Sequence, residues 1–221
     1  MTGNYPDIST DDLINELIRR EISQKDIEKA KRILSNEQIK NNLLNEIEIN
    51  DYYIEEATIK TKKIQTLSTE IISLRLRINR NSKVCGKCLF KDNTDTTLIG
   101  TNLSKRFVVD DDSLLLFIND IHKLLIQSAD WGNLYYDSLI LPVLEMINTY
   151  RNYFMHIIDM KGNGNGSKKY YRDIASINSE LIGNRIIKKE KYPDFQIAIL
   201  KRIKNMYEYL DNNLETLLEK V

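Results

Sequence analysis

The feature that most constrains this chain is a long stretch without helix-breaking residues. Residues 37–78 contain neither proline nor glycine, so nothing within them interrupts a helix. The whole chain has three prolines and eight glycines, too few for a many-stranded β protein, which needs a turn about every ten residues. Apolar residues recur at three- and four-residue steps instead. We predict an all-α helical bundle with one long helix in its N-terminal half and an inserted Cys-x-x-Cys loop.

The long stretch is predicted to form a helix from about Glu37 to Ile78. Its second half carries an apolar seam, formed by Ile64, Leu67, Ile71, Leu74 and Ile78. The apolar positions upstream follow a different frame, so a sustained coiled coil is not expected. We prefer a helix packed inside a bundle. The alternative is a seam that contacts a second copy of the chain.

Start signals divide the rest of the chain. Residues 1–8 carry no pattern and are expected to be a loose end. Capping boxes at residues 9–12, 23–26 and 35–38 predict two short helices before the long one. The expected division is N-terminal helices over 1–80, a basic Cys-x-x-Cys loop over 81–109, and a C-terminal bundle over 110–221 with the candidate active helix at 142–160.

The C-terminal bundle begins with a cluster of aspartates. Asp110–Ser113 should cap a central apolar helix over 114–126, and Mg²⁺ or Ca²⁺ binding by the aspartates is the alternative. Trp131, the single tryptophan, is expected to anchor a core or an interface. A moderate helix is expected over 173–189, and Pro193 should open the last helix, which keeps an apolar stripe to the C-terminus.

A neutral net charge hides segregated charge. Two segments are basic: residues 75–106 hold eight basic and two acidic side chains, and residues 161–191 hold eight basic and three acidic ones. The segment 110–159 between them is acidic, with two basic and eight acidic side chains. A polyanion would therefore have to be held by the two basic segments. Because there is neither a long apolar run nor a basic-then-apolar leader, we expect a soluble, cytoplasmic protein without membrane contact.

Cys85 and Cys88 are the only cysteines and have the spacing of a zinc half-site or a redox pair. A structural zinc needs four ligands, so one chain would also have to supply His122 and His156, whereas two copies across a dimer would supply four thiolates. We prefer two reduced thiols in a basic loop, where nearby lysines and Arg80 would lower the thiol pKa. A completed or shared zinc site and a disulfide are the alternatives.

The segment 139–160 divides most clearly into two faces. Pro142 either opens this helix or kinks one that begins near Leu134. An apolar stripe suited to a core is formed by Val143, Ile147, Tyr150, Phe154 and Ile157. The opposite face, with Arg151 at its border, carries Glu145, Asn148, Thr149, Asn152, His156 and Asp159.

Arg151, Asn152 and His156 form an Arg-Asn-x-x-x-His motif, in which Asn152 and His156 are neighbours on one helix face. The motif resembles that of the HEPN family of ribonucleases, a resemblance that covers about a tenth of the chain. It implies metal-independent cleavage of RNA by a homodimer whose two motif helices face each other across a shared cleft. Members of that family commonly act in host defence, in toxin–antitoxin pairs or in RNA processing.

Cleavage by the 2′-hydroxyl of RNA needs a proton carrier and a positive charge on the phosphorane. His156 would move the proton, Arg151 would hold the phosphate and Asn152 would orient either group. The glycine-rich segment 161–169 is either a plain linker or a mobile basic lip. The side chains expected to contact RNA are Lys161, Lys168, Lys169, Tyr170 and Arg172.

The second hypothesis is a non-catalytic all-α interaction or assembly subunit, viral or cellular, with or without zinc. In such a protein the motif is a solvated polar face. We prefer the nuclease because Asn152 and His156 lie off the apolar stripe. An open or dimer-facing Arg151 and His156 with basic walls would favour the nuclease, and their burial in a monomer core or isolation on an acidic surface would favour the second hypothesis.

Overall fold

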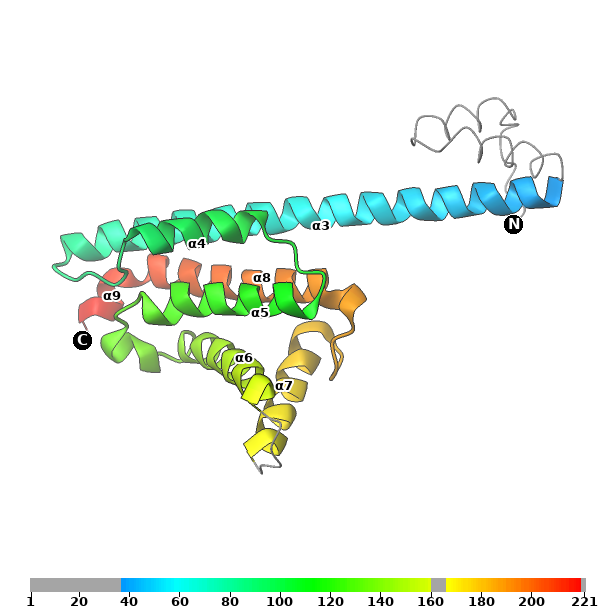
Figure 1. The fold of residues 1–221 in the computed structure, drawn as a ribbon. Coiled ribbons are helices and arrows are strands. Elements are labelled where there is room, and N and C mark those ends of the chain that lie inside the picture. Colours follow the sequence, from blue (N-terminus) through cyan, green and yellow to red (C-terminus); the bar gives the residue numbers. More distant parts are fainter. Residues whose placement is uncertain (1–36, 160–165, 220–221) are drawn as a thin grey trace. The chain divides into compact units, whose positions relative to one another are not determined.

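The computed structural model describes residues 37–159 and 166–219, with side chains over 54–154 and 171–219. Within these ranges the chain is helical, and its only β pairing is an isolated bridge between Phe90 and Ala129 (Figure 1). The all-α prediction is confirmed. The loose end and the two short helices expected before residue 36 lie outside the described residues. None of the described helices has the length and apolarity that a membrane span requires.

The chain divides into two compact units, Met1–Ala57 and Thr58–Val221, and the side chains discussed below belong to the second. The long helix α3 (Glu37–Val84) supplies residues to both. All five residues of its predicted seam are buried within the chain, at no more than 7% exposure. The bundle interpretation is therefore confirmed, and the alternative of a seam that contacts a second copy is wrong.

Helix α3 ends where the Cys-x-x-Cys motif begins. Gly86 lies in the left-handed region at φ 77°, which glycine adopts without steric cost. Its amide donates to the Lys83 carbonyl at 3.0 Å, and the Lys87 amide donates to the Ser82 carbonyl at 2.9 Å. These two bonds form a Schellman cap, which gives the glycine between the cysteines a structural role.

Helix α4 (Thr94–Lys105) occupies the second half of the segment that we expected to be a loop. Asn93 caps it: its side chain accepts a hydrogen bond from the Thr96 amide at 2.9 Å, and the Thr96 hydroxyl accepts one from the Asn93 amide at 3.0 Å. Gly100 lets α4 approach α3, because a Cβ atom there would lie 3.0 Å from Cδ1 of Ile72. The helix packs against the core through Ile99 and Leu103.

Helix α5 (Asp111–His122) is the predicted central apolar helix. Asp110 caps it by accepting a hydrogen bond from the Ser113 amide at 2.8 Å, as the sequence predicts. The helix continues as a π-helical turn, η1 (Lys123–Gln127), and a 3₁₀ turn follows as η2 (Gly132–Tyr136). Trp131 is buried, and its indole N–H donates to the Leu125 carbonyl at 2.6 Å, which confirms it as a core anchor.

Helices α6 (Leu141–Asp159) and α7 (Gly166–Ile182) form a pair set at an angle to α5 (Figure 1). Pro142 is the second residue of α6, so it opens this helix, and the prediction of a kink is wrong. Helix α7 begins seven residues before its predicted start and ends at Ile182, seven residues before its predicted end. Gly183, which follows it, has a φ of 73°. The last four residues of the predicted glycine-rich loop, 166–169, are therefore helical.

Helix α8 (Tyr192–Asn212) follows the short 3₁₀ turn η3 (Lys189–Lys191), with Pro193 in its first turn as predicted. Asn213 separates it from α9 (Leu214–Glu219). The predicted stripe is buried throughout, from Ile197 to Leu217. Gln196, which has no exposed surface, donates to the Arg106 carbonyl at 2.8 Å and accepts from the Val108 amide at 3.1 Å. It thereby fastens α8 to the segment between α4 and α5.

Candidate functional site

The core side of α6 is the predicted apolar stripe. Val143, Ile147 and Tyr150 are each at most 5% exposed, and Phe154 packs against the core while partly exposed. Tyr150 donates a hydrogen bond from its hydroxyl to Oδ1 of Asn178 on α7 at 2.5 Å. This side of α6 is therefore fixed by packing, which sets the direction in which its polar side points. The side chain of Ile157 lies outside the described ones.

The polar side of α6 carries the motif. Arg151 and Asn152 are both partly exposed, and neither makes a hydrogen bond or ion pair with another described side chain. The backbone of His156 lies on the same helix, and its side chain is beyond the described ones. The structure thus places the three motif residues on one helix and describes the side chains of the first two.

His122 is the neighbour of the motif that the sequence did not reveal. It is 6% exposed, and its Nε2 lies 3.1 Å from Oδ1 of Asn148 on α6. Burial lowers the pKa of His122, the positive charge of Arg151 lowers it further, and the hydrogen bond to Asn148 acts in the opposite direction. A neutral imidazole therefore ties α5 to α6 beside Arg151. The sequence favours a packed or surface position for His122 over a catalytic role, and the structure shows it packed.

The residues predicted to contact RNA are carried mainly by α7. Lys161 lies outside the described residues, and Lys168, Lys169 and Tyr170 belong to the first turns of α7, with their side chains not described. Arg172 is exposed on the same helix. Lys168 and Arg172 are four residues apart and so are neighbours on the helix surface. The predicted basic lip is thus a helix start rather than a loop from Gly166 onward.

Cys85 and Cys88 are both exposed free thiols, so the disulfide alternative is wrong. Cys88 donates from Sγ to the Phe90 carbonyl at 3.4 Å. Among the side chains that the structure describes, no group of three or more His, Cys, Asp or Glu residues is placed to hold a metal ion. His122 is bound to Asn148 instead of converging on the cysteines.

The aspartates at the start of α5 have structural partners. Hydrogen bonds from Ser113 lower the pKa of Asp110, as expected for a capping carboxylate. Asp111 accepts a hydrogen bond from the Tyr192 hydroxyl and lies 3.5 Å from Nζ of Lys189. These contacts support the capping interpretation of the cluster.

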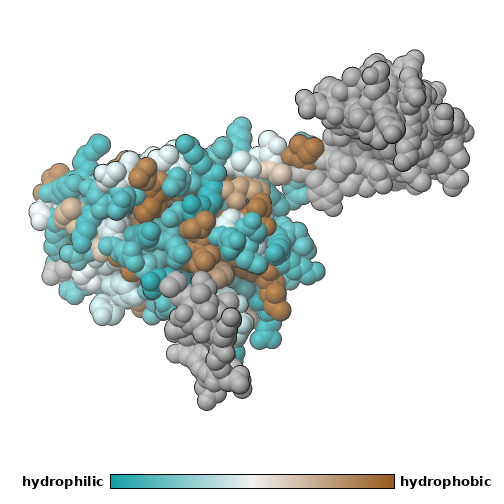
Figure 2. All heavy atoms as spheres, viewed as in Figure 1, coloured by the Kyte–Doolittle hydropathy of each residue, from teal (hydrophilic) through white to brown (hydrophobic). Residues whose placement is uncertain are grey.

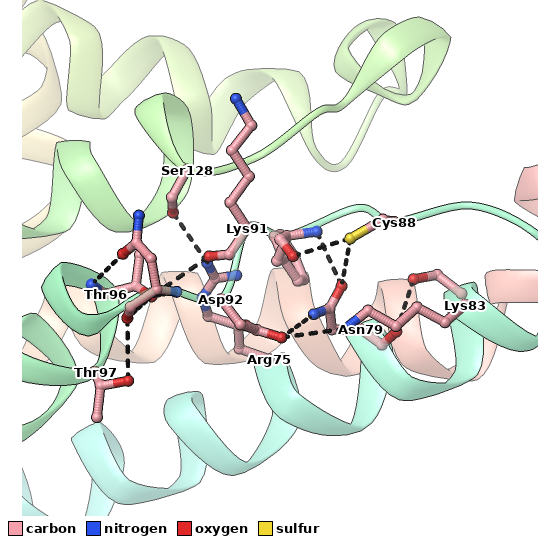
Figure 3. Close-up of polar contacts among 12 residues, drawn as sticks. Arg75, Asn79, Lys83, Cys88, Lys91, Asp92, Thr96, Thr97 and Ser128 are labelled. Carbon is pink, nitrogen blue, oxygen red and sulfur yellow. Dashed lines mark hydrogen bonds and ion pairs between the residues drawn. The ribbon is translucent and has the colours of Figure 1, made fainter.

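A buried polar cluster links α3 to the segment after the cysteines (Figure 3). Arg75, 3% exposed, donates to the Ser128 hydroxyl at 2.9 Å and to the Lys91 carbonyl at 3.2 Å. Its guanidinium carbon lies 4.2 Å from the centroid of the Phe90 ring. No carboxylate among the described side chains pairs with Arg75, which is unusual for a buried arginine, and the sequence periodicity did not predict it.

Asn79 and Lys83 extend this cluster along α3 at four-residue steps, which places them on one helix face with Arg75 (Figure 3). Asn79 accepts a hydrogen bond from the Phe90 amide at 3.0 Å and donates one to Asp92. Lys83 lies 3.4 Å from the same carboxylate. The cluster holds the segment 90–92 against α3. Its contacts do not indicate a chemical reaction.

Comparisons with protein-family models, with curated proteins and with solved structures find no match. The case for a function therefore rests on the residues of this chain. Arg151 and Asn152 on α6, with His122 near enough for the charge of Arg151 to lower its pKa, form the candidate site.

Proposed function

We propose that this chain is a metal-independent endoribonuclease in which Arg151, Asn152 and His156 act together across the cleft of a homodimer. The observation that carries the proposal is the state of Arg151. It is a partly exposed cation on a firmly packed helix, with no ion pair to another described side chain. A guanidinium in that state can bind a phosphate through two parallel hydrogen bonds.

The proposed reaction uses the RNA's own nucleophile. The 2′-oxygen attacks the adjacent phosphorus, the bond from phosphorus to the 5′-oxygen breaks, and the products are a 2′,3′-cyclic phosphate and a 5′-hydroxyl. His156 takes the proton from the 2′-hydroxyl or gives one to the leaving 5′-oxygen, since an imidazole titrates near neutral pH. Arg151 stabilises the negative charge on the phosphorane. Asn152 orients the side chain of Arg151 or of His156.

The acidic charge of the segment that contains α6 counts against RNA binding by one chain, so we propose a dimer as the active form. The segment 110–159 that contains α6 is acidic, which disfavours a polyanion. Basic residues of α7, including the exposed Arg172, and the basic segments of a second copy would supply the missing positive walls. We propose the cytoplasm as the location of this activity, in host defence, a toxin–antitoxin pair or RNA processing.

The test is RNA cleavage in the presence of EDTA by wild type, His156→Ala and Arg151→Ala. Loss of a proton carrier or of phosphorane stabilisation should lower the rate by about a hundredfold or more. Glu145→Gln is the matched control, because Glu145 is an exposed residue of α6 outside the motif. Equal cleavage by wild type and His156→Ala, or no cleavage by either, rejects the proposal.

The second candidate is a non-catalytic interaction or assembly subunit. The specific observation in its favour is an aromatic-lined cavity beside α6 with exposed apolar residues at its rim, among them Ile186 at 80% exposure. Such a surface suits binding rather than catalysis. In this case wild type would not cleave RNA, and the polar face of α6 would be solvated surface.

Two copies of the chain could share a structural zinc through the exposed thiols of Cys85 and Cys88, under either candidate function. Four thiolates from two chains would complete a tetrahedral site. Metal analysis of the purified protein should then give one zinc per two chains, and Cys85→Ser should abolish zinc binding. A monomeric protein without zinc after purification in zinc-containing buffer contradicts the shared site.

A further inference from the structure

A cavity of about 620 Å³ lies among α5, α6, α7 and the segment before α8. This volume is within the range of small-molecule sites, roughly 300–1,000 Å³. Five of its lining residues are aromatic: Tyr150, Tyr153, Phe154, Tyr171 and Tyr192. On the visible face of the molecule, which is mainly hydrophilic, apolar residues gather over α5 and beside α7 (Figure 2).

The aromatic rings meet nearly at right angles. The centroids of Tyr153 and Tyr171 are 5.4 Å apart with an interplanar angle of 84°, and those of Tyr153 and Phe154 are 5.4 Å apart at 69°. Rings in this arrangement present walls in several directions. That geometry suits a rounded cationic group, which is attracted to ring faces, better than a flat base, which needs parallel rings.

Three tyrosines of the cavity, Tyr150, Tyr153 and Tyr192, keep neutral rings. Burial raises the pKa of Tyr150, Tyr153 and Tyr192, and the nearby carboxylate of Asp111 raises the last two further. All three phenols are therefore protonated at physiological pH. Neutral rings keep the negative π faces that attract a cation without adding a formal charge.

The charged residues at the cavity favour a positive ligand. Asp111 and Asp112 both line it, and Arg185 is the one basic residue among the described lining side chains. Asp111 is engaged by Tyr192 and Lys189, whereas the exposed Asp112 has no hydrogen bond or ion pair with another described side chain. Arg185 is exposed and so keeps its hydration. The carboxylate available to a ligand is that of Asp112.

We propose that this cavity binds an organic cation, an alkylated ammonium group joined to an apolar body. The ammonium group contacts the rings of Tyr153 and Tyr171 near the carboxylate of Asp112. The apolar body lies against Leu114 and Ile174, which are buried residues of the cavity wall. The proposal is independent of RNA cleavage, because neither Arg151 nor Asn152 lines the cavity.

The first test compares three probes with the same six-carbon body and different charge: hexyltrimethylammonium, hexanol and hexanesulfonate. Titration calorimetry on the full chain should show that the cation binds at least about tenfold more tightly than the other two. Equal binding of all three would mean an unspecific apolar cavity, and tighter binding of the sulfonate would mean an anion site at Arg185. Either result overturns the proposal, as does the absence of saturable binding of the cation.

The second test uses variants of the cavity. Tyr153→Leu removes the central ring and Asp112→Asn removes the carboxylate, and each should weaken binding of hexyltrimethylammonium by about tenfold. Tyr153→Phe keeps a ring and should bind within about threefold of wild type. Tyr136→Leu and Asp130→Asn are matched controls outside the cavity, both at exposed positions.

The variant results decide the matter even if Tyr153→Leu does not fold, because Asp112→Asn changes only an exposed side chain. Wild-type affinity in Asp112→Asn, or Tyr153→Phe weakened by about tenfold, would overturn the proposed geometry. Competition by a trimethyllysine peptide, but not by its unmethylated form, would assign the ligand to a modified protein. A peptide that does not compete while hexyltrimethylammonium still binds would assign it to a free small molecule.

Discussion

Two arginines of this chain stand in opposite environments. Arg75 on α3 is almost completely buried, donates to Ser128 and to a backbone carbonyl, and lies over the ring of Phe90. Arg151 on α6 is partly exposed and has no hydrogen bond or ion pair to another described side chain. The same residue type is thus bound into the fold at one place and left accessible at the other.

The difference separates a structural charge from a functional one. Burying a cation costs free energy that only well-placed hydrogen bonds and a ring face can offset, so the contacts of Arg75 are needed for the fold. Arg151 keeps part of its hydration, and the fold does not depend on its contacts. A ligand phosphate can therefore bind Arg151 without breaking existing interactions.

The largest expected effect on stability follows from Arg75→Met. The change removes the buried donor of the Ser128 hydroxyl and one of the two donors of the Lys91 carbonyl, which should lower the free energy of unfolding by about 2–4 kcal/mol. Urea unfolding measures it. Arg80→Met is the control, because Arg80 is exposed on the same helix, and it should change stability by no more than about 0.5 kcal/mol. A similar loss of unfolding free energy in both variants would show that the buried contacts of Arg75 do not stabilise the fold.

A smaller effect is expected from pH, through the histidine that lies beside Arg151. The pKa of His122 is lower in the folded chain than its ordinary 6.5, so the unfolded chain binds a proton more readily. Stability should be intact above about pH 7 and fall as the pH drops below about 6.5 toward the folded pKa. His122→Gln, which can still bond to Asn148, should lose less stability over that interval. Urea unfolding midpoints that fall equally for wild type and His122→Gln over this pH interval would contradict the prediction.

The smallest effect tests how close the guanidinium of Arg151 lies to the imidazole of His122. The charge of Arg151 contributes to the lowered pKa of His122, so Arg151→Met should raise that pKa. NMR titration of the imidazole protons, in a His156→Gln background that leaves one histidine, measures the change directly. Lys123→Met is the control, since it removes an exposed charge next to His122 in sequence. An unchanged pKa in Arg151→Met would place the guanidinium away from His122.

The sequence predicted those parts of the fold that depend on apolar periodicity. The seam of α3, the cap at Asp110, the burial of Trp131 and the stripe of α8 all follow from residue spacing and local hydrogen bonding. Helix α4 was missed because its threonine-rich sequence carries an Asn-x-x-Thr capping box and only a short apolar face. Local signals of that kind are weak.

The candidate site was only partly accessible to sequence reasoning. The face that carries Arg151 and Asn152 could be read from the helical repeat of α6. The approach of His122 to Asn148 could not, because it depends on how α5 and α6 pack against each other. The buried Arg75 and the aromatic cavity depend on residues brought together from separate helices, and no local pattern predicts such contacts.

The most direct test of the central claim, that Arg151 serves a ligand and not the fold, is to measure unfolding and RNA cleavage on the same Arg151→Ala protein. We predict a free energy of unfolding within about 0.5 kcal/mol of wild type and cleavage in EDTA reduced by about a hundredfold or more. A destabilised protein that cleaves RNA as well as wild type, or a wild-type protein that does not cleave RNA, would contradict the claim.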